Sequence, residues 1–403
     1  MHALTSPYCL SSYLLSSCRR IILSSSFDTR VSTSFNCFSN PTAPRYYSSG
    51  DSSAPTMSRA SDHKPSEKAR KSPMVPRPSA SVLLISPTNQ VLLLHRVQTS
   101  SAFPSAHVFP GGNVSTYHDG EPPAPDHPNR HEDGEVYRYA AIRETFEESG
   151  ILLAKNNGFG RLIEVEDGER EAGRKLVHKN EVPFKTWLAK KGGRADIENL
   201  IPFTRWITPT NVPKRFTTQM YLYFLPLPTS QAPVSASIGP LPTTSEAVIP
   251  PPTHDGGLEH TAARFLPAAF WLSMARSGEI ILFPPQFFLL HHVSQYLNPD
   301  VPGALEPDML RQQRKELRDF IYRRREGEPS WADACISPTG MTKRLEDGRQ
   351  ILGLERAGPE LEGSGRRGVK EWVCFVRFTK EGPREVDVGL RSEVLGQGKE
   401  AKI

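Results

Sequence analysis

Cysteine is scarce in this chain, and its few cysteines form no motif. Five occur among 403 residues, three of them within the first 40, and none is spaced as Cys-x-x-Cys: Cys9, Cys18, Cys37, Cys335 and Cys374. A disulfide-stapled fold and a zinc site both need closely spaced cysteines in a regular pattern. The sequence therefore excludes both and favours a reducing compartment.

Long apolar runs are also missing. The most apolar early stretch, from Leu10 to Leu23, is interrupted by serine pairs and by Arg19-Arg20. A membrane-spanning helix needs about 20 consecutive apolar residues. We therefore expect a soluble chain with no membrane span.

A strong excess of one charge is absent as well. The net charge is +5, and lysines and arginines do not gather into a basic stripe. Nucleic acid is thus not expected as the main partner, since its recognition usually requires a concentrated patch of basic residues. A small anionic substrate stays compatible with this charge.

The two ends of the chain have their own composition. Residues 1–75 are rich in serine, and the first 50 contain four arginines but one acidic residue, Asp28. This is typical of a mitochondrial transit peptide, and the run Arg45-Tyr46-Tyr47-Ser48 is similar to a presequence cleavage site. A low-complexity tail is the alternative. Either way, we expect residues 1–75 to be a disordered targeting segment outside the fold.

The last three residues, Ala401-Lys402-Ile403, are small, basic and aliphatic. They are similar to the Ser-Lys-Leu peroxisomal address, which an import receptor reads at a free carboxyl end. A plain frayed tail is the alternative. A start at Met57 would remove most of the presequence. The expected location is therefore the peroxisome, the mitochondrion or both, with the peroxisomal import receptor as a partner.

Between the two ends, the pattern predicts strands on both sides of one central helix. Residues 81–85 and 90–96 are apolar runs separated by Pro87-Thr88-Asn89, which predicts a β-hairpin. Phe109-Pro110-Gly111-Gly112 predicts a tight turn. Further strands are expected at 205–207, 220–225, 262–266 and 369–378, and a loop at 226–253. One or two helices are expected within 165–195, and others at 267–277, after Pro284-Pro285-Gln286-Phe287 through Tyr296, and at 307–326.

Three glutamates in one helical turn are the most informative feature of the chain. Glu144, Glu147 and Glu148 are three and four residues apart, so their carboxylates project from one helix face. Like charges at this spacing repel, whereas a hard divalent cation such as Mg²⁺ binds carboxylate oxygens and keeps waters and phosphates as its other ligands. Gly150 supplies a helix stop. The run predicts a Mg²⁺ or Mn²⁺ site.

The run Arg143-Glu144-Thr145-Phe146-Glu147-Glu148-Ser149-Gly150-Ile151, with Glu135 eight residues before Arg143, resembles the Nudix box, Gx5Ex7REUxEExGU. Thr145 stands where an aliphatic residue is usual, and Gly112 is too far from Glu135. The resemblance implies a hydrolase of nucleoside diphosphate derivatives. It also implies an α+β Nudix fold over residues 76–300, a mixed β-sheet sandwiched between helices, with insertions at about 113–134 and 228–257. Residues 301–403 form a C-terminal extension.

A second stretch narrows the resemblance. Leu92-Leu93-Leu94-His95-Arg96, followed by Phe109-Pro110-Gly111-Gly112, keeps the frame of the coenzyme-A signature LLTxRSxxxRxxxGxxxFPGG. Four of its letters are replaced, by Leu94, Val97, Ser101 and Ser105. Together with residues 206–216 and 278–286, this resembles the peroxisomal coenzyme-A diphosphatase branch. The implied reaction splits CoA or acyl-CoA into 3′,5′-ADP and a 4′-phosphopantetheine.

Two alternatives stay open: a Nudix hydrolase of another nucleotide, such as NADH, ADP-ribose or capped RNA, and a binding module that has lost its chemistry.

The resemblance also implies roles for individual residues. Glu144 and Glu148 are expected to be the principal metal ligands, with Glu147 as a further ligand or the general base. Arg143 is expected to orient Glu135 and the ligand carboxylates, because a guanidinium binds carboxylates bidentately. Gly111 and Gly112 would let the backbone approach the phosphates. Candidates for binding the 3′-phosphate of CoA are Arg96, Lys214 and Arg215, which could equally be solvated surface charges.

The insertion after Gly112 is rich in potential metal ligands: His118, Asp119, Asp126, His127, His131, Glu132 and Asp133. A mobile polar loop is the favoured interpretation, and a second metal site is the alternative. The pair His291-His292 lies in an apolar stretch and is expected to be packing.

Overall fold

The computed structural model describes residues 73–97, 105–156, 161–227 and 260–396. All of these belong to one compact unit, Ala69–Ile403. The expected disordered segment 1–75 falls almost wholly outside the described residues, as do the insertion expected at about 228–257 and the carboxyl-terminal tripeptide.

The central element is an eight-stranded mixed sheet. Its main path runs β10-β7-β8-β1-β2-β3, with β4 paired to β1 and β9 paired to β2. The pairs β1–β8 and β10–β7 are parallel, and the other pairs are antiparallel. The strands are β1 Arg77–Ile85, β2 Val91–Arg96, β3 His107–Val108, β4 Gly111–Asn113, β7 Ile201–Ile207, β8 Phe216–Phe224, β9 His260–Leu266 and β10 Cys335–Ile336.

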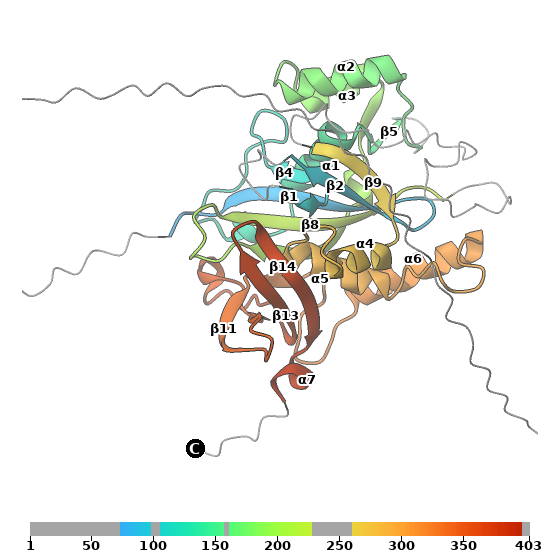
Figure 1. Cartoon of the computed structure of the whole chain (residues 1–403). Coiled ribbons are helices and arrows are strands. Elements are labelled where there is room, and N and C mark those ends of the chain that lie inside the picture. The colour runs from blue at the N-terminus through green and yellow to red at the C-terminus, as the bar shows by residue number, and fades with distance from the viewer. Residues whose placement is uncertain (1–72, 98–104, 157–160, 228–259, 397–403) are drawn as a thin grey trace, which may run out of the picture. The chain divides into compact units, whose positions relative to one another are not determined.

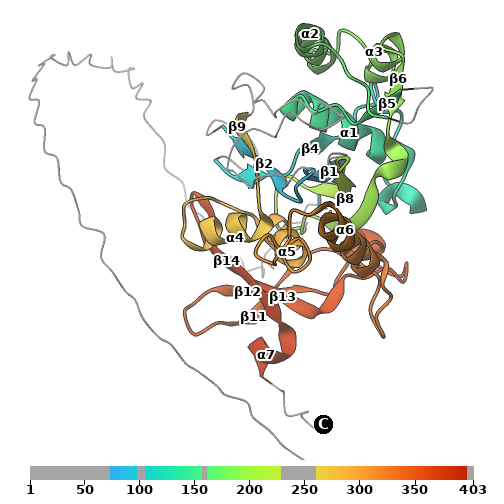
Figure 2. The same cartoon turned by 90° about the vertical axis from the view of Figure 1, so that its right-hand side faces the viewer.

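Both faces of this sheet are covered, which explains the continuous apolar run in β1. Ala80, Val82 and Leu84 lie in the core beneath α1 (Glu135–Ser149), while Leu83 and Ile85 lie in the core on the opposite face. Alternate residues of a strand point to opposite faces, so a strand buried on both sides carries no polar alternation. Helices α4 (Ala268–Arg276) and α5 (Pro284–Ser294) cover the second face (Figures 1 and 2). The expected fold, a mixed sheet sandwiched between helices, is confirmed.

A helical hairpin lies beyond α1, on the side away from the sheet (Figure 2). It consists of α2 (Asp167–His178) and α3 (Phe184–Lys190), and a two-stranded sheet accompanies it, β5 (Ala154–Asn156) with β6 (Gly193–Ala195). The aromatic rings of Phe146 and Trp187 stack with centroids 4.9 Å apart, which attaches α3 to α1. The hairpin therefore lies against the helix that carries the three glutamates.

The C-terminal extension shares a core with the rest of the chain. Helix α6 (Pro307–Tyr322) and an antiparallel sheet, β11-β12-β13-β14, contribute buried residues to the cluster that also holds Trp206 and Phe288. The sheet strands are Thr339–Arg344, Gln350–Leu354, Val369–Thr379 and Gly382–Leu390, followed by α7 at Arg391–Leu395. Short 3-10 helices lie at Pro128–His131, Ile197–Asn199 and Pro359–Leu361.

A buried arginine ties α6 to the central sheet. Arg314 donates to Oδ1 of Asn89 at 2.7 Å and to the carbonyl oxygens of Leu225 and Ser86, both at 2.7 Å. Burial lowers the pKa of Arg314 to about 9. Because three neutral oxygens hold this cation in place, the extension is fixed to the turn between β1 and β2 by polar as well as apolar contacts.

Most expected elements are found. Several strands, such as β1 and β7, are longer than expected, whereas helices α4, α5 and α6 end earlier. The hairpin expected at 81–96 is β1–β2, with Ile85 opposite Val91. One expectation was wrong: Gly111 and Gly112 do not form a tight turn but belong to strand β4, which pairs with Ser79–Ser81 of β1. Strands β3, β5, β6, β10, β11, β12 and β14 were not foreseen, because they are short or carry few apolar residues.

The structure also bears on the expectations about cysteines and about a membrane span. The described cysteines, Cys335 and Cys374, are free and buried, and burial raises the pKa of both thiols. Within the described ranges, no helix is both long and apolar enough to cross a membrane.

Candidate active site

Helix α1 presents the glutamates because both of its ends are fixed. Gly134 is the N-cap in an extended conformation, and Gly150 ends the helix with φ of +73° while its N–H donates to the carbonyl of Phe146. A left-handed residue at this position favours glycine, which explains the stop expected there. Ile142 and Phe146 are fully buried. Thr145, unusual for the box, is also buried, and its hydroxyl donates to the carbonyl of Ala141 at 2.8 Å.

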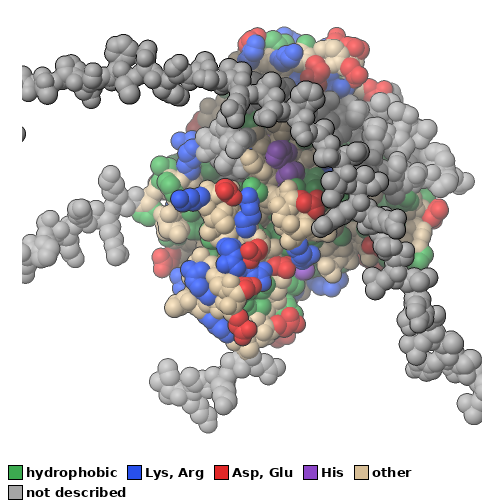
Figure 3. Space-filling view, viewed as in Figure 1, with side chains coloured by type: hydrophobic (Ala, Val, Ile, Leu, Met, Phe, Trp, Pro, Cys, Tyr) green, Lys and Arg blue, Asp and Glu red, His purple; other side chains and the backbone are tan. Residues whose placement is uncertain are grey.

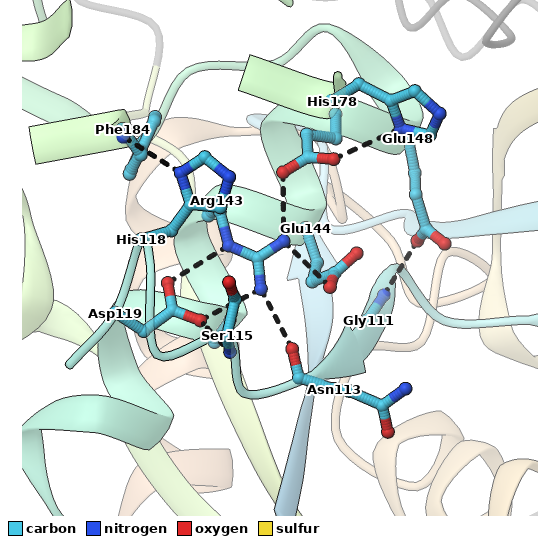
Figure 4. Close-up of polar contacts among 12 residues, drawn as sticks. Gly111, Asn113, Ser115, His118, Asp119, Arg143, Glu144, Glu148, His178 and Phe184 are labelled. Atoms are coloured by element: carbon cyan, nitrogen blue, oxygen red, sulfur yellow. Dashed lines mark hydrogen bonds and ion pairs between the residues drawn. The ribbon is translucent and has the colours of Figure 1, made fainter. Parts of the chain in front are cut away.

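Arg143 is the centre of the site (Figure 4). Its Nη1 donates to Glu144 Oε1 and to Glu147 Oε1, both at 2.9 Å, and its Nη2 donates to the carbonyl of Asn113 at 2.9 Å. Burial alone would lower the pKa of Arg143, but the surrounding carboxylates, Glu144 first, raise it well above its ordinary value. The guanidinium therefore stays charged and holds two of the glutamates in place.

The acidic partner expected for Arg143 was wrong. Glu135 is 67% exposed, and its partner is Lys185 at 3.9 Å. Arg143 instead binds Asp119 bidentately, from Nε to Oδ1 at 3.0 Å and from Nη2 to Oδ2 at 2.9 Å. The long insertion therefore lies between Asp119 and α1. The sequence contains only a weak signal for Asp119, because it follows Gly112 by seven positions where the box has six, and the count back from Arg143 pointed to Glu135.

Glu144 lies directly over Gly112. A Cβ placed on Gly112 would be 2.5 Å from the Glu144 carboxyl carbon, far inside van der Waals contact. Burial raises the pKa of Glu144 to about 7, against the opposing effect of Arg143. The absence of a side chain at Gly112 thus makes room for a carboxylate of this protein; no substrate phosphate is needed to explain it.

Glu148 is held by the adjacent glycine. The backbone N–H of Gly111 donates to Glu148 Oε2 at 2.8 Å, and Nε2 of His260 lies 3.6 Å from Glu148 Oε1. His260 is fully buried and begins β9, beside Arg96 of β2. Strands β4 and β9 together fix the position of this carboxylate.

Glu147 has a partner on each oxygen. Arg143 holds Oε1, and Nδ1 of His178, the last residue of α2, lies 3.2 Å from Oε2. Neither His178 nor His260 was singled out from the sequence. No local spacing could have revealed them, because each comes from an element far along the chain from α1.

The insertion is only partly the polar loop that was expected. Asp126, His127, Glu132 and Asp133 are exposed. Three others are buried: Asp119 on Arg143, His131 with Nδ1 2.9 Å from the Thr217 hydroxyl, and His118. His118 Nε2 lies 2.8 Å from Asn180 Oδ1, and its Nδ1 accepts the N–H of Phe184 at 3.1 Å. His118 therefore joins the insertion to the α2–α3 hairpin.

The candidate phosphate-binding residues separate into different environments. Arg215 is 1% exposed and binds Glu360, the carbonyl of Thr208 and the carbonyl of Met74. The prediction for Arg215 was therefore wrong, since its guanidinium is committed inside the fold. Lys214 is exposed, and Arg96 lies at the end of β2 opposite His260. Of the three candidates, Arg96 alone lies next to β9, the strand whose first residue, His260, lies near Glu148.

The pair His291-His292 packs as expected. His292 is buried among Phe288, Trp331 and Trp372, and the half-buried His291 contacts Trp372. On the surface, acidic and basic side chains intermingle over the face drawn in Figure 3.

The donor set of the site fits a hard divalent cation bound by few protein ligands. In the described part of the chain, no group of three or more His, Cys, Asp or Glu side chains is arranged to hold a metal ion. The expected three-ligand cluster of Glu144, Glu147 and Glu148 is thus not formed, because Glu147 is turned toward Arg143 and His178. Mg²⁺ needs only one or two carboxylates besides waters and phosphates, which Glu144 and Glu148 can supply.

Comparison with known proteins agrees with this geometry. Residues 75–222 match the NUDIX domain family. Residues 75–222 are thus similar to the NUDIX domain, in agreement with a mixed sheet sandwiched between helices.

Two curated relatives are similar over part of their length. "Putative nudix hydrolase 7" of Caenorhabditis elegans is 32% identical over 147 residues, 36% of this chain and 43% of the relative. "Acyl-coenzyme A diphosphatase NUDT19" of Xenopus laevis is 33% identical over 159 residues, 30% of this chain and 42% of the relative. The chain thus spans less than half the length of either. Among solved structures, a NUDIX hydrolase from Alicyclobacillus acidocaldarius matches with 22% identity and a TM-score of 0.40, over 54% of this chain and 90% of that one.

Proposed function

We propose that this protein is a metal-dependent hydrolase of a nucleoside diphosphate derivative, and that its substrate is CoA or acyl-CoA. The observation that carries the proposal is the turn of α1 in which Arg143 holds Glu144 and Glu147 while Gly111 holds Glu148. Arg143, Glu147 and Glu148 are each fixed by segments remote in sequence, and Arg143 in turn fixes Glu144. A solvated surface helix would need none of these contacts.

We assign separate roles to the residues of the site. Glu144 and Glu148 would hold Mg²⁺ or Mn²⁺. Arg143, itself bound by Asp119, keeps Glu144 in place, and the Gly111 N–H keeps Glu148 in place. A divalent cation bound there would neutralise the diphosphate oxygens and lower the pKa of a coordinated water. Glu147, fixed on both oxygens, is the candidate for accepting the proton of the attacking water.

The choice of CoA rests on the signature frame and on one relative. Ser105 stands where the coenzyme-A signature has glycine, and its φ is +56°, in the left-handed region that favours glycine. The backbone at this position is thus compatible with the signature although the letter differs. A relative named acyl-coenzyme A diphosphatase shares 33% identity over 159 residues.

A substrate panel tests the proposal. Purified protein is incubated with CoA, acetyl-CoA, a long-chain acyl-CoA, NADH and ADP-ribose, with Mg²⁺, with Mn²⁺ or with EDTA. We expect 3′,5′-ADP and a phosphopantetheine from the CoA compounds, at a kcat/KM at least about tenfold above that for the others. Preference for NADH or ADP-ribose would refute the CoA assignment, and no turnover of any substrate would refute the hydrolase.

The second candidate is a hydrolase of another nucleotide. It is favoured by the departures from the signature at Leu94 and Val97, and at Ser101, which lies outside the described residues. The same panel separates the two, because only a CoA hydrolase releases phosphopantetheine. An inactive binding module would instead show metal binding without nucleotide release.

We also propose a peroxisomal pool of the protein, with a mitochondrial pool from the longer start, on the strength of the two end sequences alone. Fluorescent fusions at either end, with and without Ile403, test this. A peroxisomal signal that persists after deletion of Ile403 would refute recognition of the terminal tripeptide by the import receptor.

A further inference from the structure

The α2–α3 hairpin brings a histidine to the glutamates from outside the box. His178 is the final residue of α2, 31 positions after Glu147, and its Nδ1 lies 3.2 Å from Glu147 Oε2. The ring is 40% exposed, whereas Glu147 is 8% exposed. The contact therefore joins a buried carboxylate of the candidate site to a partly solvated ring.

Several contacts hold the hairpin against α1 at this point. Nε of Arg174, one turn before His178, donates to the carbonyl of Glu147 at 2.7 Å. Gly173 lies so close to Trp187 of α3 that a Cβ there would be 2.2 Å from the indole. At the turn of the hairpin, His118 contacts Asn180 and accepts the N–H of Phe184. These contacts leave His178 little freedom to move away from Glu147.

The chemistry of the contact fixes its direction. An ionised carboxylate only accepts hydrogen bonds, so Nδ1 of His178 must carry the hydrogen, and a neutral ring then has an acceptor at Nε2. Glu147 consequently has a donor on each oxygen, Arg143 on one and His178 on the other. Rotation of the carboxylate about its last bond would break both hydrogen bonds.

We propose that His178 is a positioning residue that fixes the carboxylate of Glu147 in its orientation toward the reacting water. The inference rests on the proposed hydrolase function. It assigns the α2–α3 hairpin, a segment with no part in the Nudix box, to the active site. It also separates Glu147, held by His178, from Glu144 and Glu148, which remain to hold the cation.

Three substitutions at one position test the proposal. His178→Ala removes the donor, His178→Asn retains an N–H near the place of Nδ1, and His178→Gln offers one near the place of Nε2. We expect His178→Ala to lower kcat by about 10- to 100-fold, with KM within about twofold of the wild type, since loss of orientation acts on the chemical step. His178→Asn should recover most of kcat, and His178→Gln should not.

Controls separate orientation from folding. Lys175→Ala changes an exposed residue on the same face of α2, one turn away, and should leave kcat and Tm unchanged. Mn²⁺ affinity, followed by electron paramagnetic resonance, should be the same in His178→Ala as in the wild type, because neither proposed ligand is touched. In a Glu147→Gln background, His178→Ala should cause no further loss, as expected of residues that act as a unit.

The outcomes distinguish the two proposals. If the wild type turns over CoA and His178→Ala is as active, or if Gln restores activity as well as Asn, positioning by His178 is refuted and the hydrolase stands. If the wild type turns over no diphosphate, the hydrolase itself is refuted. Should His178→Ala fail to fold, comparison of the Asn and Gln variants still decides the matter.

Discussion

Two adjacent glycines of β4 should respond in opposite ways to the same substitution. A methyl group on Gly112 would lie 2.5 Å from the carboxyl carbon of Glu144, the end of a flexible side chain. A methyl group on Gly111 would lie 2.4 Å from the carbonyl oxygen of Ala80 and 2.6 Å from Cα of Ser81, which are backbone atoms of the central strand. The first clash can be relieved by a side chain, and the second only by moving the sheet.

The size of each effect follows from what has to move. To regain ordinary contact, the Glu144 carboxylate must retreat by about 1 Å, and a displacement of that size in an active site costs about 100-fold in rate. Gly112→Ala should therefore lower kcat by about 100-fold and leave the free energy of unfolding within about 1 kcal/mol of the wild type. Gly111→Ala should lower that free energy by about 2 kcal/mol or more, because overpacking against backbone is not easily relieved.

Urea unfolding followed by circular dichroism, together with steady-state turnover of CoA, measures both quantities on the same preparations. Lys175→Ala is the control, because this side chain is exposed on α2 and contacts none of the glutamates in the described part of the chain. A fully active Gly112→Ala variant would refute the placement of Glu144 over this glycine. A Gly111→Ala variant as stable as the wild type would refute the close pairing of β4 with β1.

Three further outcomes are expected. Glu148→Gln should lower kcat by at least about 100-fold while Tm changes little, since the amide still accepts the Gly111 N–H but binds a divalent cation poorly; full activity would remove Glu148 from the site. Arg314→Ala should lower the free energy of unfolding by about 3 kcal/mol in urea, because three buried oxygens lose their donor, and an unchanged midpoint would contradict the anchoring of α6. Burial lowers the pKa of His292 well below its ordinary value, and its Nε2 has no hydrogen-bond partner among the described residues. The folded state thus favours the neutral ring, so this contribution to stability is complete above pH 6.5 and is lost as the pH falls below it. His292→Phe should be more stable than the wild type by about 1 kcal/mol at pH 7 and by more at pH 5; equal slopes of stability against pH in the two proteins would refute this.

The sequence correctly predicted the elements that depend on interactions between neighbouring residues. The apolar run of β1, the turn before Gln90 and the glycine stop after α1 each follow from neighbouring residues, and the structure contains all three. The short strands β3 and β10 have two residues each. They exist because a neighbouring strand presents hydrogen-bonding groups to them, and no local pattern records that.

Within the site, the sequence failed wherever a partner came from a distant segment. The count back from Arg143 selected Glu135, yet the folded chain places Glu135 in solvent and Asp119 on the guanidinium. The length of an insertion does not reveal which of its residues will contact the helix in the folded chain. The prediction that Arg215 binds a phosphate was wrong for a related reason. Burial, and not residue type, decides whether a cationic side chain is available to a ligand.

The amino-acid sequence by itself determined that three carboxylates share one face of a helix, because the 3.6-residue period depends only on the backbone. Which groups meet those carboxylates was decided by the tertiary structure: Asp119 from the insertion, Gly111 from β4, His178 from the hairpin and His260 from β9. Contacts between segments far apart in sequence depend on how layers pack, and packing is a property of the whole folded chain.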